Sequence, residues 1–470
     1  MDTYVDVSII SRLTGRVRSA DLCLSLHSVQ EVILPKAGTL KYGTSSVSLE
    51  DITSCGVNYY KHALGCCRKA SPLLPTTVFD ELESFCTMFL NLDRDRNGLL
   101  DDEYFDIQEQ NISYGLRQCQ NPRDKVYGLL AIIGNISDLD LWLDPDYSQS
   151  VSEVFHQATF AMLYRDVSSL KGLTGACYGP DPKKWASWVR DFGAIMTEIQ
   201  STVESNRLMI YDLFNASMKK KSRAEFFTTW PAWPPPADKM PHQVGLGLIG
   251  KCIGTVAVSC AETHWKDSAD KDEVQRNVLS SWIQASGVDF DRYLSDRHCS
   301  DDMLGFWRTL LGGVMSAGHD DTEYSDWRRF TTESLVWLEP FVSWIRTGEP
   351  GLDFALDRTL LVTTDSRCYF KTADGGQGLC HPSAHVGDQI WVLHGSNVPF
   401  VLRRAVLNDE ESAELRPRDA YVLVGDDVSL KSDYVAPEKP YEHYYLIGDC
   451  YVDGFMDGEA ADGTNFVVLV

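Results

Sequence analysis

The stretch Asn121-Pro-Arg-Asp-Lys-Val-Tyr-Gly-Leu-Leu-Ala-Ile-Ile-Gly134 decides much of the fold, together with Asp144-Pro-Asp-Tyr-Ser-Gln-Ser-Val-Ser-Glu-Val-Phe155. Pro122 has no backbone N–H and a fixed φ, so it suits the first position of a helix. The apolar residues after it recur at helical spacing and predict a helix over 121–134. Ser150, with Glu153 three residues later, is typical of a capping box. We therefore expect a second helix over 150–164.

The composition limits the class of protein. The chain has 470 residues, and its 43 Lys+Arg against 67 Asp+Glu give a formal net charge of −24. This length allows two or three domains. An acidic surface repels nucleic-acid phosphate and anionic lipid, so neither nucleic acid nor a membrane is an expected partner. The start of the chain lacks the pattern of a signal peptide, and no apolar run is long enough to span a bilayer, which predicts a soluble, cytoplasmic protein. Thirteen cysteines without Cys-x-x-Cys spacing predict free thiols.

Hydrophobic periodicity divides the chain into regions of different character. Residues 26–52 have a strand-like pattern, and residues 180–245 are rich in loop signals. Helical patterns occupy residues 79–92, 273–285 and 301–314. Short apolar runs typical of strands follow at residues 360–363, 389–393, 398–402, 421–424 and 444–447. The predicted domains are therefore an α/β region over 1–170, a mostly helical region over 171–350 and a β-rich region over 351–470.

Two motifs suggest a ligand but favour a simpler interpretation. Asp93, Asp95, Asn97 and Asp101 have the spacing of early ligands in an EF-hand calcium loop. The last ligand position holds Tyr104 where a bidentate Glu belongs, which favours a solvated acidic turn. Gly245-Leu-Gly-Leu-Ile-Gly250 matches the dinucleotide fingerprint G-x-G-x-x-G, but the residues that follow it predict a strand where the fingerprint needs a helix. We therefore expect no metal and no cofactor.

Four residues are the catalytic candidates, and each also has a structural interpretation. Trp307 and Arg308 are neighbours on a predicted helix and so point in different directions. One is expected in the core, and the other is expected to reach a carboxylate. Asp457 and Glu459 flank Gly458, so they either stabilise a tight turn or present an acid to a pocket.

The motif at 121–155 resembles the "DPRDKVYALLGL … PDYS-x-SVEEVF" signature of the fungal heterokaryon-incompatibility family, the HET-domain proteins. Further matches to family motifs occur along the chain, over about residues 27 to 460: Val29-Gln-Glu-Val32, Lys184-Trp-Ala-Ser-Trp-Val-Arg-Asp-Phe192, Phe306-Trp-Arg-Thr-Leu310, Val398-Pro-Phe-Val-Leu-Arg403 and Tyr445-Leu-Ile-Gly-Asp-Cys-Tyr-Val-Asp-Gly-Phe-Met-Asp-Gly-Glu459. Asp453 stands where the family usually has His.

The resemblance implies a fold. The family's HET domain is similar to TIR-like folds, and its "ALSY-x-WG" and "LWIDALCINQ" motifs precede the segment that corresponds to Gln30-Glu31. Neither motif is found upstream of Gln30 in this sequence. The expected fold class is therefore α+β, with a remnant of a TIR-like α/β unit, a helical middle region and a β-rich C-terminal region.

The resemblance also implies two functions. HET-like proteins without the intact domain are associated with fungal secondary-metabolite biosynthesis, including cofactor-free cyclisation such as Diels–Alder ring closure on terpene-derived substrates. Such a cyclase takes a small apolar substrate and needs a shaped apolar pocket with one or two hydrogen-bond donors. The alternative is a heterokaryon-incompatibility or innate-immunity factor that acts through protein partners, and an inactive gene remnant is a third possibility. The sequence alone favours the cyclase.

Overall fold

The computed structural model describes residues 26–35, 37–42, 44–62, 76–100, 105–133, 143, 145–165, 169–175, 186–194, 196–218, 225–228, 245–264, 271–292, 300–316, 327–348, 352–406, 419–424, 427–431 and 442–470. The chain divides into two compact units, Met1–Pro145 and Asp146–Val470. We call them unit 1 and unit 2 and describe each by itself. The finer division at residues 170 and 350 stays a prediction.

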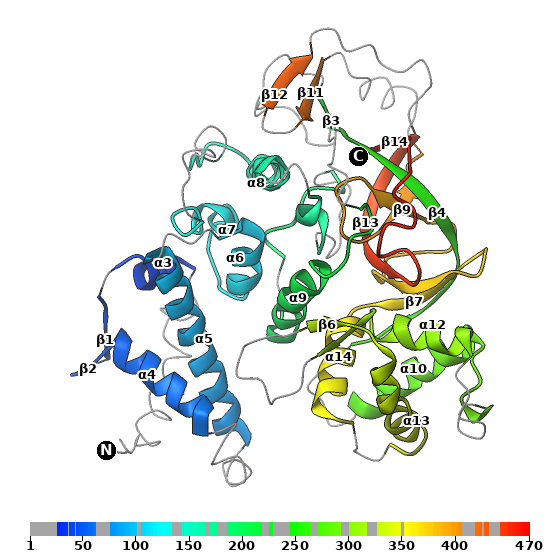
Figure 1. The fold of residues 1–470 in the computed structure, drawn as a ribbon. Helices are drawn as coiled ribbons and strands as arrows, with labels where there is room; N and C mark the ends of the chain where they lie inside the picture. Colours follow the sequence, from blue (N-terminus) through cyan, green and yellow to red (C-terminus); the bar gives the residue numbers. More distant parts are fainter. Residues whose placement is uncertain are drawn as a thin grey trace. The chain divides into compact units, whose positions relative to one another are not determined.

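Helices dominate the described part of unit 1 (Figure 1). In chain order the elements are α3 (His27–Ile33), β1 (Thr39–Tyr42), β2 (Ser45–Ser48), α4 (Leu49–Tyr60), α5 (Thr76–Leu100), α6 (Ile107–Tyr114) and α7 (Asp124–Tyr127). β1 and β2 form an antiparallel hairpin, which lies within the predicted strand region. The strand prediction is wrong for residues 27–33, where α3 forms, and for residues 49–52, where α4 begins. Val29 and Ile33, four residues apart, are both buried, as one face of a helix requires.

The stretch at residues 121–134, which we call the opening motif, forms a shorter helix than the one predicted. Only Asp124–Tyr127 is helical, and hydrogen-bonded turns continue to Ile133. Gly128 carries little helix propensity. The buried Lys125 ammonium donates to the carbonyls of Gly115 (2.7 Å) and Arg117 (2.6 Å). The Gln30 side chain donates to the Gly128 carbonyl at 2.8 Å. The motif therefore joins α3, α6 and α7 within unit 1.

Unit 2 is built on a large sheet. Its hydrogen-bonded order is β12-β11-β3-β4-β7-β8-β13-β10-β9; β14 lies between β13 and β4, and β4 also pairs with β9. The pairing of β13 with β14 is parallel and the other pairings are antiparallel. The strands are β3 (Glu225–Thr228), β4 (Gly245–Glu262), β7 (Cys368–Thr372), β8 (Gln377–Cys380), β9 (Gln389–Leu393), β10 (Phe400–Arg404), β11 (Asp419–Val424), β12 (Asp427–Lys431), β13 (Glu442–Val452) and β14 (Asn465–Leu469).

Most sequence expectations for this sheet are confirmed. Strands form at four of the predicted C-terminal runs, and Gly245–Gly250 lies inside β4 together with the strand predicted after it. The strand predicted at residues 360–363 is wrong, because α14 (Phe354–Thr364) covers it. The Asp353 side chain caps that helix, and Leu356 and Leu360, four residues apart, are fully buried.

The remaining elements of unit 2 are α8 (Val151–Arg165), the 3₁₀ turn η4 (Lys171–Leu173), α9 (Glu198–Tyr211), α10 (Lys271–Ser286), α12 (Asp301–Leu310), β5 (Val314–Ser316), β6 (Trp327–Arg329), η6 (Thr332–Trp337) and α13 (Leu338–Thr347). The capping box at Ser150 and Glu153 is confirmed by both of its hydrogen bonds. The helical predictions for α8 and α10 are confirmed, and the one for residues 301–314 is confirmed up to Leu310, since Val314 already lies in β5. The loop-rich expectation misses α9, which has its own capping box from Thr197 and Gln200.

A core of large side chains joins one face of the sheet to helices. α10, α12, α13 and α14 gather beside β7 (Figure 1). Trp282, Trp307 and Phe341 from these helices pack with Tyr369 of β7 and Leu379 of β8. The mixed α+β class is therefore confirmed, as are the helical middle region and the β-rich C-terminal region. Parallel TIR-like pairing is not seen among the described residues of unit 1.

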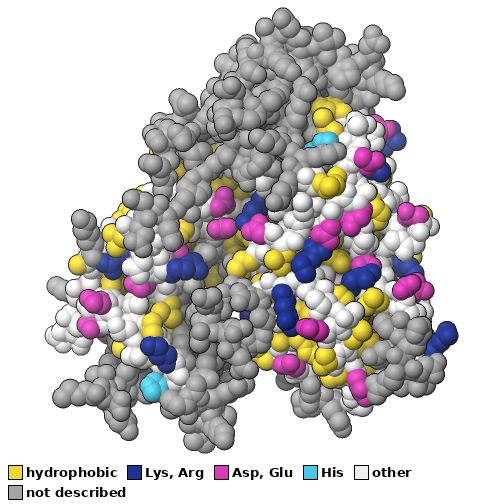
Figure 2. Space-filling model, in the orientation of Figure 1, with side chains coloured by type: hydrophobic (Ala, Val, Ile, Leu, Met, Phe, Trp, Pro, Cys, Tyr) yellow, Lys and Arg dark blue, Asp and Glu magenta, His cyan; other side chains and the backbone are white. Residues whose placement is uncertain are grey.

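The visible surface carries charges of both signs. On the face shown in Figure 2, acidic and basic side chains of the described residues are interspersed. Among the helices of the described ranges, none combines the length and apolar character needed to cross a membrane.

Candidate functional site

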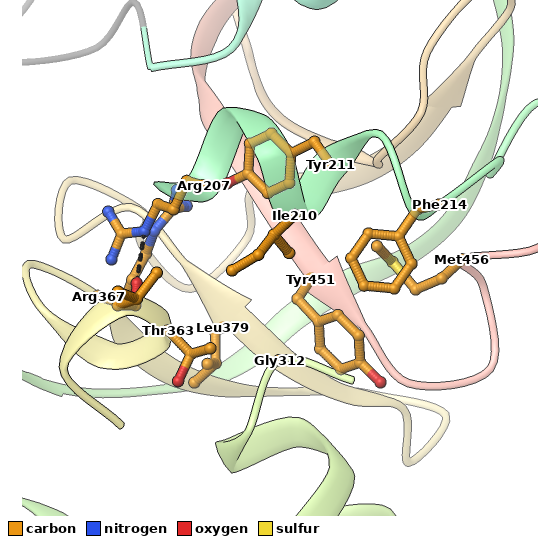
Figure 3. Close-up of a pocket in the computed structure, with 11 residues that line it drawn as sticks. Arg207, Ile210, Tyr211, Phe214, Gly312, Thr363, Arg367, Leu379, Tyr451 and Met456 are labelled. Carbon is orange, nitrogen blue, oxygen red and sulfur yellow. Dashed lines mark hydrogen bonds between the residues drawn. The ribbon is translucent and has the colours of Figure 1, made fainter. Parts of the chain in front are cut away.

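A small cavity in unit 2 lies where α9 and the turn after it meet the sheet (Figure 3). Arg207, Tyr211 and Arg367 supply its polar wall, and the rest of its lining is mainly apolar: Ile210, Phe214, Gly312, Val362, Thr363, Leu379, Tyr451 and Met456. The volume of the cavity is about 30 Å³. That space suits one or a few water molecules. Pockets for organic ligands are about 300–1,000 Å³, so a terpene-derived molecule does not fit this cavity.

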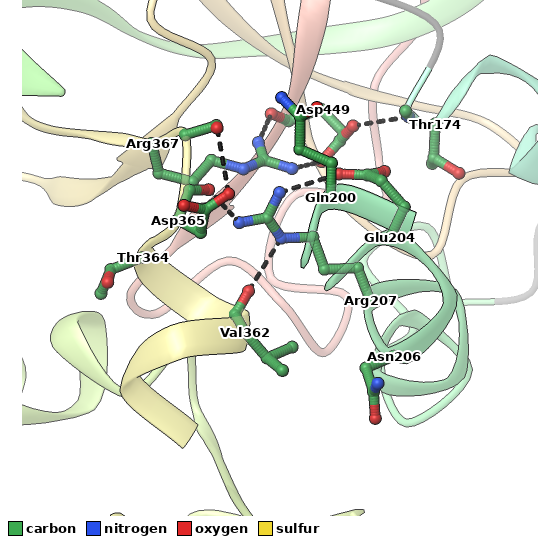
Figure 4. Close-up of polar contacts among 12 residues, drawn as sticks. Thr174, Gln200, Glu204, Asn206, Arg207, Val362, Thr364, Asp365, Arg367 and Asp449 are labelled. Carbon is green, nitrogen blue, oxygen red and sulfur yellow. Dashed lines mark hydrogen bonds and ion pairs between the residues drawn. The ribbon is translucent and has the colours of Figure 1, made fainter. Parts of the chain in front are cut away.

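A group of charged side chains lies beside the cavity (Figure 4). We call Glu204, Arg207, Tyr211, Arg367 and Asp449 the buried charge cluster, since each is no more than 9% exposed. The first three lie on α9 at spacings of three and four residues, which places them on one face of the helix. Of the other two, Arg367 lies directly before β7 and Asp449 lies in β13.

The first half of the cluster attaches α9 to the end of α14. Arg207 pairs with Glu204 at 2.9 Å (Nη1 to Oε1). Its Nε donates to the Val362 carbonyl at 2.9 Å, and its Nη2 donates to the Asp365 carbonyl. The guanidinium therefore uses its fixed fork on one carboxylate and two backbone oxygens.

The second half of the cluster surrounds the Asp449 carboxylate. It accepts from the Gly175 N–H (2.9 Å), from the Tyr211 hydroxyl and from the Arg367 guanidinium. Arg367 also donates to the Asp449 carbonyl (2.6 Å) and to the Tyr211 oxygen (2.9 Å). Helix α9, strand β7 and strand β13 are thus joined by one buried ion pair and its hydrogen bonds.

The pKa shifts of Asp449 and Tyr211 indicate that the cluster has a structural role. Burial alone would raise the pKa of Asp449, but Arg367, the Gly175 N–H and the Tyr211 hydroxyl outweigh it and hold that pKa below its usual range. Burial is likewise the main cause that raises the pKa of Tyr211. A carboxylate that stays charged and a phenol that stays neutral do not exchange protons near neutral pH. The cluster therefore holds three segments together, and it is poorly suited to general acid–base catalysis.

The structure separates the roles of Trp307 and Arg308. Trp307 is fully buried, and its indole N–H donates to the Ser334 carbonyl at 3.3 Å. Arg308 makes a bidentate pair with Asp453, with distances of 2.8 Å (Nε to Oδ1) and 2.9 Å (Nη2 to Oδ2). The expectation of one core residue and one partner of a carboxylate is met by these contacts.

Asp457 and Glu459 lie at a turn near the surface. The backbone N–H of Asp457 donates to the Glu459 carboxylate at 2.9 Å, and the Asp457 carboxylate pairs with Arg329. Neither of these acids, nor Trp307 or Arg308, lines the cavity described above. The structure therefore does not bring the four catalytic candidates together around that cavity, and their catalytic role stays a prediction.

The calcium alternative does not match the backbone of unit 1. Asp93, Asp95 and Asn97 lie within α5, which continues as a helix to Leu100. Asp101 lies outside the described residues. Asp95 is buried and accepts from the Tyr114 hydroxyl at 2.6 Å. An EF-hand needs a loop at these positions, so this interpretation is wrong for residues 93–100. In the parts of the chain that the structure describes, no three His, Cys, Asp or Glu side chains are grouped as a metal would require.

The buried charge cluster was not found from the sequence. Its members come from three segments that are far apart in the chain. Asp449 lies in the tail motif, and Glu204, Arg207 and Tyr211 have a helical spacing in a region assigned to loops. The capping box at Thr197 and Gln200 was the available signal for that helix.

Comparison with known proteins identifies a distant relative. The chain is 22% identical to the Neurospora crassa protein named heterokaryon incompatibility protein 6, OR allele, over 391 aligned residues. The alignment covers 73% of this chain and 49% of the relative, so the chain spans about half the length of that protein. No family model matches the chain. No solved structure matches it. The similarity agrees with the motifs along the sequence, and both show that the chain is similar to the fungal heterokaryon-incompatibility proteins.

Proposed function

We propose that this chain acts in fungal heterokaryon incompatibility and does so by recognising a protein partner. The observation that supports this function best is the similarity to heterokaryon incompatibility protein 6 of Neurospora crassa, which extends over 391 aligned residues. The sequence motifs favour a cyclase, whereas the comparison with known proteins favours the alternative, an incompatibility factor that acts through protein partners.

The geometry of unit 2 is consistent with a recognition function. Several of its buried charges bind one another, as Arg367 binds Asp449, and they hold α9 against the sheet. The cavity beside them admits water but not a terpene-derived substrate. A rigid body of this kind can present a surface to a protein partner without a catalytic centre.

The cyclase stays a second prediction with no comparison behind it. It would require a larger apolar pocket than the one at Arg207 and Tyr211. Its product would be a ring-closed metabolite, so the two functions give different results in the same fungal strain.

The test is a hyphal-fusion assay. The gene is introduced into a fungal strain that otherwise fuses freely, and the strain is paired with tester strains that differ at incompatibility loci. We expect restricted growth and death of fusion cells, measured with a vital dye, with at least one tester and not in self-pairings. Metabolite extracts of the same strains are compared by mass spectrometry. Unchanged fusion in every pairing, with a cyclised product that depends on the gene, would establish the cyclase instead.

Two variants are compared in that assay, one that breaks a buried ion pair and a control that breaks an exposed one. Arg367→Ala breaks the buried ion pair and is expected to abolish the incompatibility response by destabilising unit 2. Arg346→Ala removes a half-exposed guanidinium that pairs with exposed Asp291, and it should leave the response unchanged, because exposed ion pairs contribute little.

A further inference from the structure

Three cysteines lie side by side across three neighbouring strands of unit 2. In β7 and β8, Cys368 is directly opposite Cys380. In β8 and β13, Cys380 is directly opposite Cys450. Opposite residues of antiparallel strands project to the same face of a sheet. We call these three residues the cysteine row.

The side chains of the cysteine row share one environment. All three are buried in the same apolar cluster, which also contains Val256 and Phe370, and all three are free thiols. The next residues along the strands, Tyr369, Leu379 and Tyr451, pack on the opposite face with the helices. Burial first, and then the charges of Cys368 and Cys450, raise the pKa of the Cys380 thiol, which agrees with their proximity.

The two pairs in the row have different backbone geometry. The Asp453 N–H donates to the Gln377 carbonyl, so by alternation Cys380 and Cys450 form a non-hydrogen-bonded pair. The Cys450 N–H agrees with this, since it donates to the Pro399 carbonyl on the other side of β13. The Thr372 N–H donates to the Gly376 carbonyl, which makes Cys368 and Cys380 a hydrogen-bonded pair.

Non-hydrogen-bonded pairs bring their side chains closer. Their Cα atoms lie about 4.5 Å apart, against about 5.5 Å in hydrogen-bonded pairs. Both separations fall within the range that a disulfide spans, about 4.4–6.8 Å between Cα atoms. Cys380 is the central thiol and can pair on either side, whereas Cys368 and Cys450 are two strands apart and cannot bridge without moving the backbone.

We propose that the cysteine row is an oxidation site, in which hydrogen peroxide converts Cys380 and Cys450 into a cross-strand disulfide, with Cys368 as the alternative partner of Cys380. One thiol attacks the peroxide, the O–O bond breaks, and a sulfenic acid and water form. The second thiol then attacks that sulfur, the S–O bond breaks, and the disulfide forms with release of a second water. The two thiol sulfurs lose two electrons and the peroxide gains them.

The disulfide would act on the segments that carry the buried charge cluster. Arg367 directly precedes Cys368, and Asp449 directly precedes Cys450. A covalent bond between β8 and β13 at this point would hold the strand that presents the Asp449 carboxylate. Oxidation is therefore expected to make unit 2 more resistant to unfolding.

The burial of the Cys380 and Cys450 thiols should slow the reaction. Burial raises the pKa of Cys380 and Cys450 above that of an exposed thiol, so little thiolate exists near neutral pH. The reaction is therefore expected to be slower than that of an exposed cysteine and to accelerate as the pH rises.

Peptide mapping of the full chain tests the proposal. The purified protein is incubated with hydrogen peroxide under native conditions, its remaining thiols are alkylated, and its peptides are identified by mass spectrometry. We expect the Cys380–Cys450 cross-link as the main disulfide and an unfolding midpoint in urea that rises and returns after dithiothreitol. Native protein with no cross-link within the row, or with Cys380 joined mainly to a cysteine outside it, overturns the proposal.

Single variants sharpen the result. In Cys450→Ala the cross-link should move to Cys368–Cys380 with a lower yield, and in Cys368→Ala it should stay at Cys380–Cys450. Cys380→Ala should remove both cross-links. Cys86→Ala removes a buried cysteine of α5 and should leave the wild-type pattern. If Cys380→Ala does not fold, the wild-type map and the Cys450→Ala map still decide the outcome.

Discussion

At the scale of single residues, the Arg367–Asp449 pair is a buried ion pair that joins two segments of unit 2. Asp449→Asn keeps the shape of the side chain and removes its charge, which leaves the buried Arg367 guanidinium without its paired carboxylate. Loss of one partner of a buried pair costs about 3–5 kcal/mol. We expect the free energy of unfolding, measured in urea, to fall by that order.

Asp457→Asn is the matched control for this prediction. Asp457 is half-exposed and pairs with half-exposed Arg329, so its loss should cost about 1 kcal/mol or less. Equal losses in the two variants would show that the buried charge cluster has no special weight in the stability of unit 2.

Two histidines of unit 2 predict loss of stability in acid. Burial lowers the pKa of His156 to about 3, and burial with the nearby charge of Arg367 lowers the pKa of His381 to about 4. In the unfolded chain both pKa values return to about 6.5. Between those limits the unfolded state binds the proton, so each histidine contributes stability that is present above pH 6.5 and is lost as the pH falls through the folded pKa.

His156→Phe isolates one of these contributions. Phenylalanine keeps an aromatic ring against Trp188, which the imidazole meets edge-on at 4.7 Å between ring centroids. The slope of unfolding free energy against pH, measured between pH 6 and pH 4, should decrease by at most about 1.4 kcal/mol per pH unit. An unchanged slope would mean that His156 does not titrate differently in the two states.

At the scale of elements, the opening motif is best explained by its tertiary contacts. Pro122 and the apolar spacing predicted a long helix, and the structure forms a short one followed by turns. Local rules did not reveal that Lys125 would donate to two carbonyls of a neighbouring segment, or that the Gln30 amide would donate to Gly128. Those partners lie elsewhere in the chain, so periodicity could not specify them.

Lys125→Met tests the importance of those contacts. The substitution keeps the length of the side chain and leaves the carbonyls of Gly115 and Arg117 without the ammonium donor. Each unsatisfied buried group costs about 1–3 kcal/mol, so amide hydrogen exchange in residues 105–133 should accelerate at least tenfold. Lys171→Met, which removes a pair with exposed Asp212, is the control and should leave that exchange unchanged.

The helix α14 shows why a β-rich pattern can be misleading. The run Leu360-Leu-Val-Thr-Thr364 has the composition of a strand. In the structure the hydroxyls of Thr359, Thr363 and Thr364 bond back to carbonyls four residues earlier, and the cap at Asp353 fixes the start of the helix. Side-chain hydrogen bonds and burial outweigh the local propensity there.

At the scale of the whole molecule, the sequence predicted the class of fold better than its topology. Short apolar runs correctly predicted four of the C-terminal strands, β9, β10, β11 and β13, because each of these strands has its own local pattern. The pairing of β4 with β3, β7, β9 and β14 depends on contacts between distant segments and could not be read locally. The same holds for the buried charge cluster, which takes residues from α9, from the position before β7 and from β13.

The division at Pro145 and Asp146 predicts separable unfolding. A chain with two compact units need not unfold in one cooperative step. Lys125 lies in unit 1 and Asp449 in unit 2, and each makes its buried polar contacts within its own unit. In calorimetry of the full chain we expect two transitions, one lowered by Lys125→Met and the other lowered by Asp449→Asn. A single transition that both variants lower equally would show that the two units unfold as one.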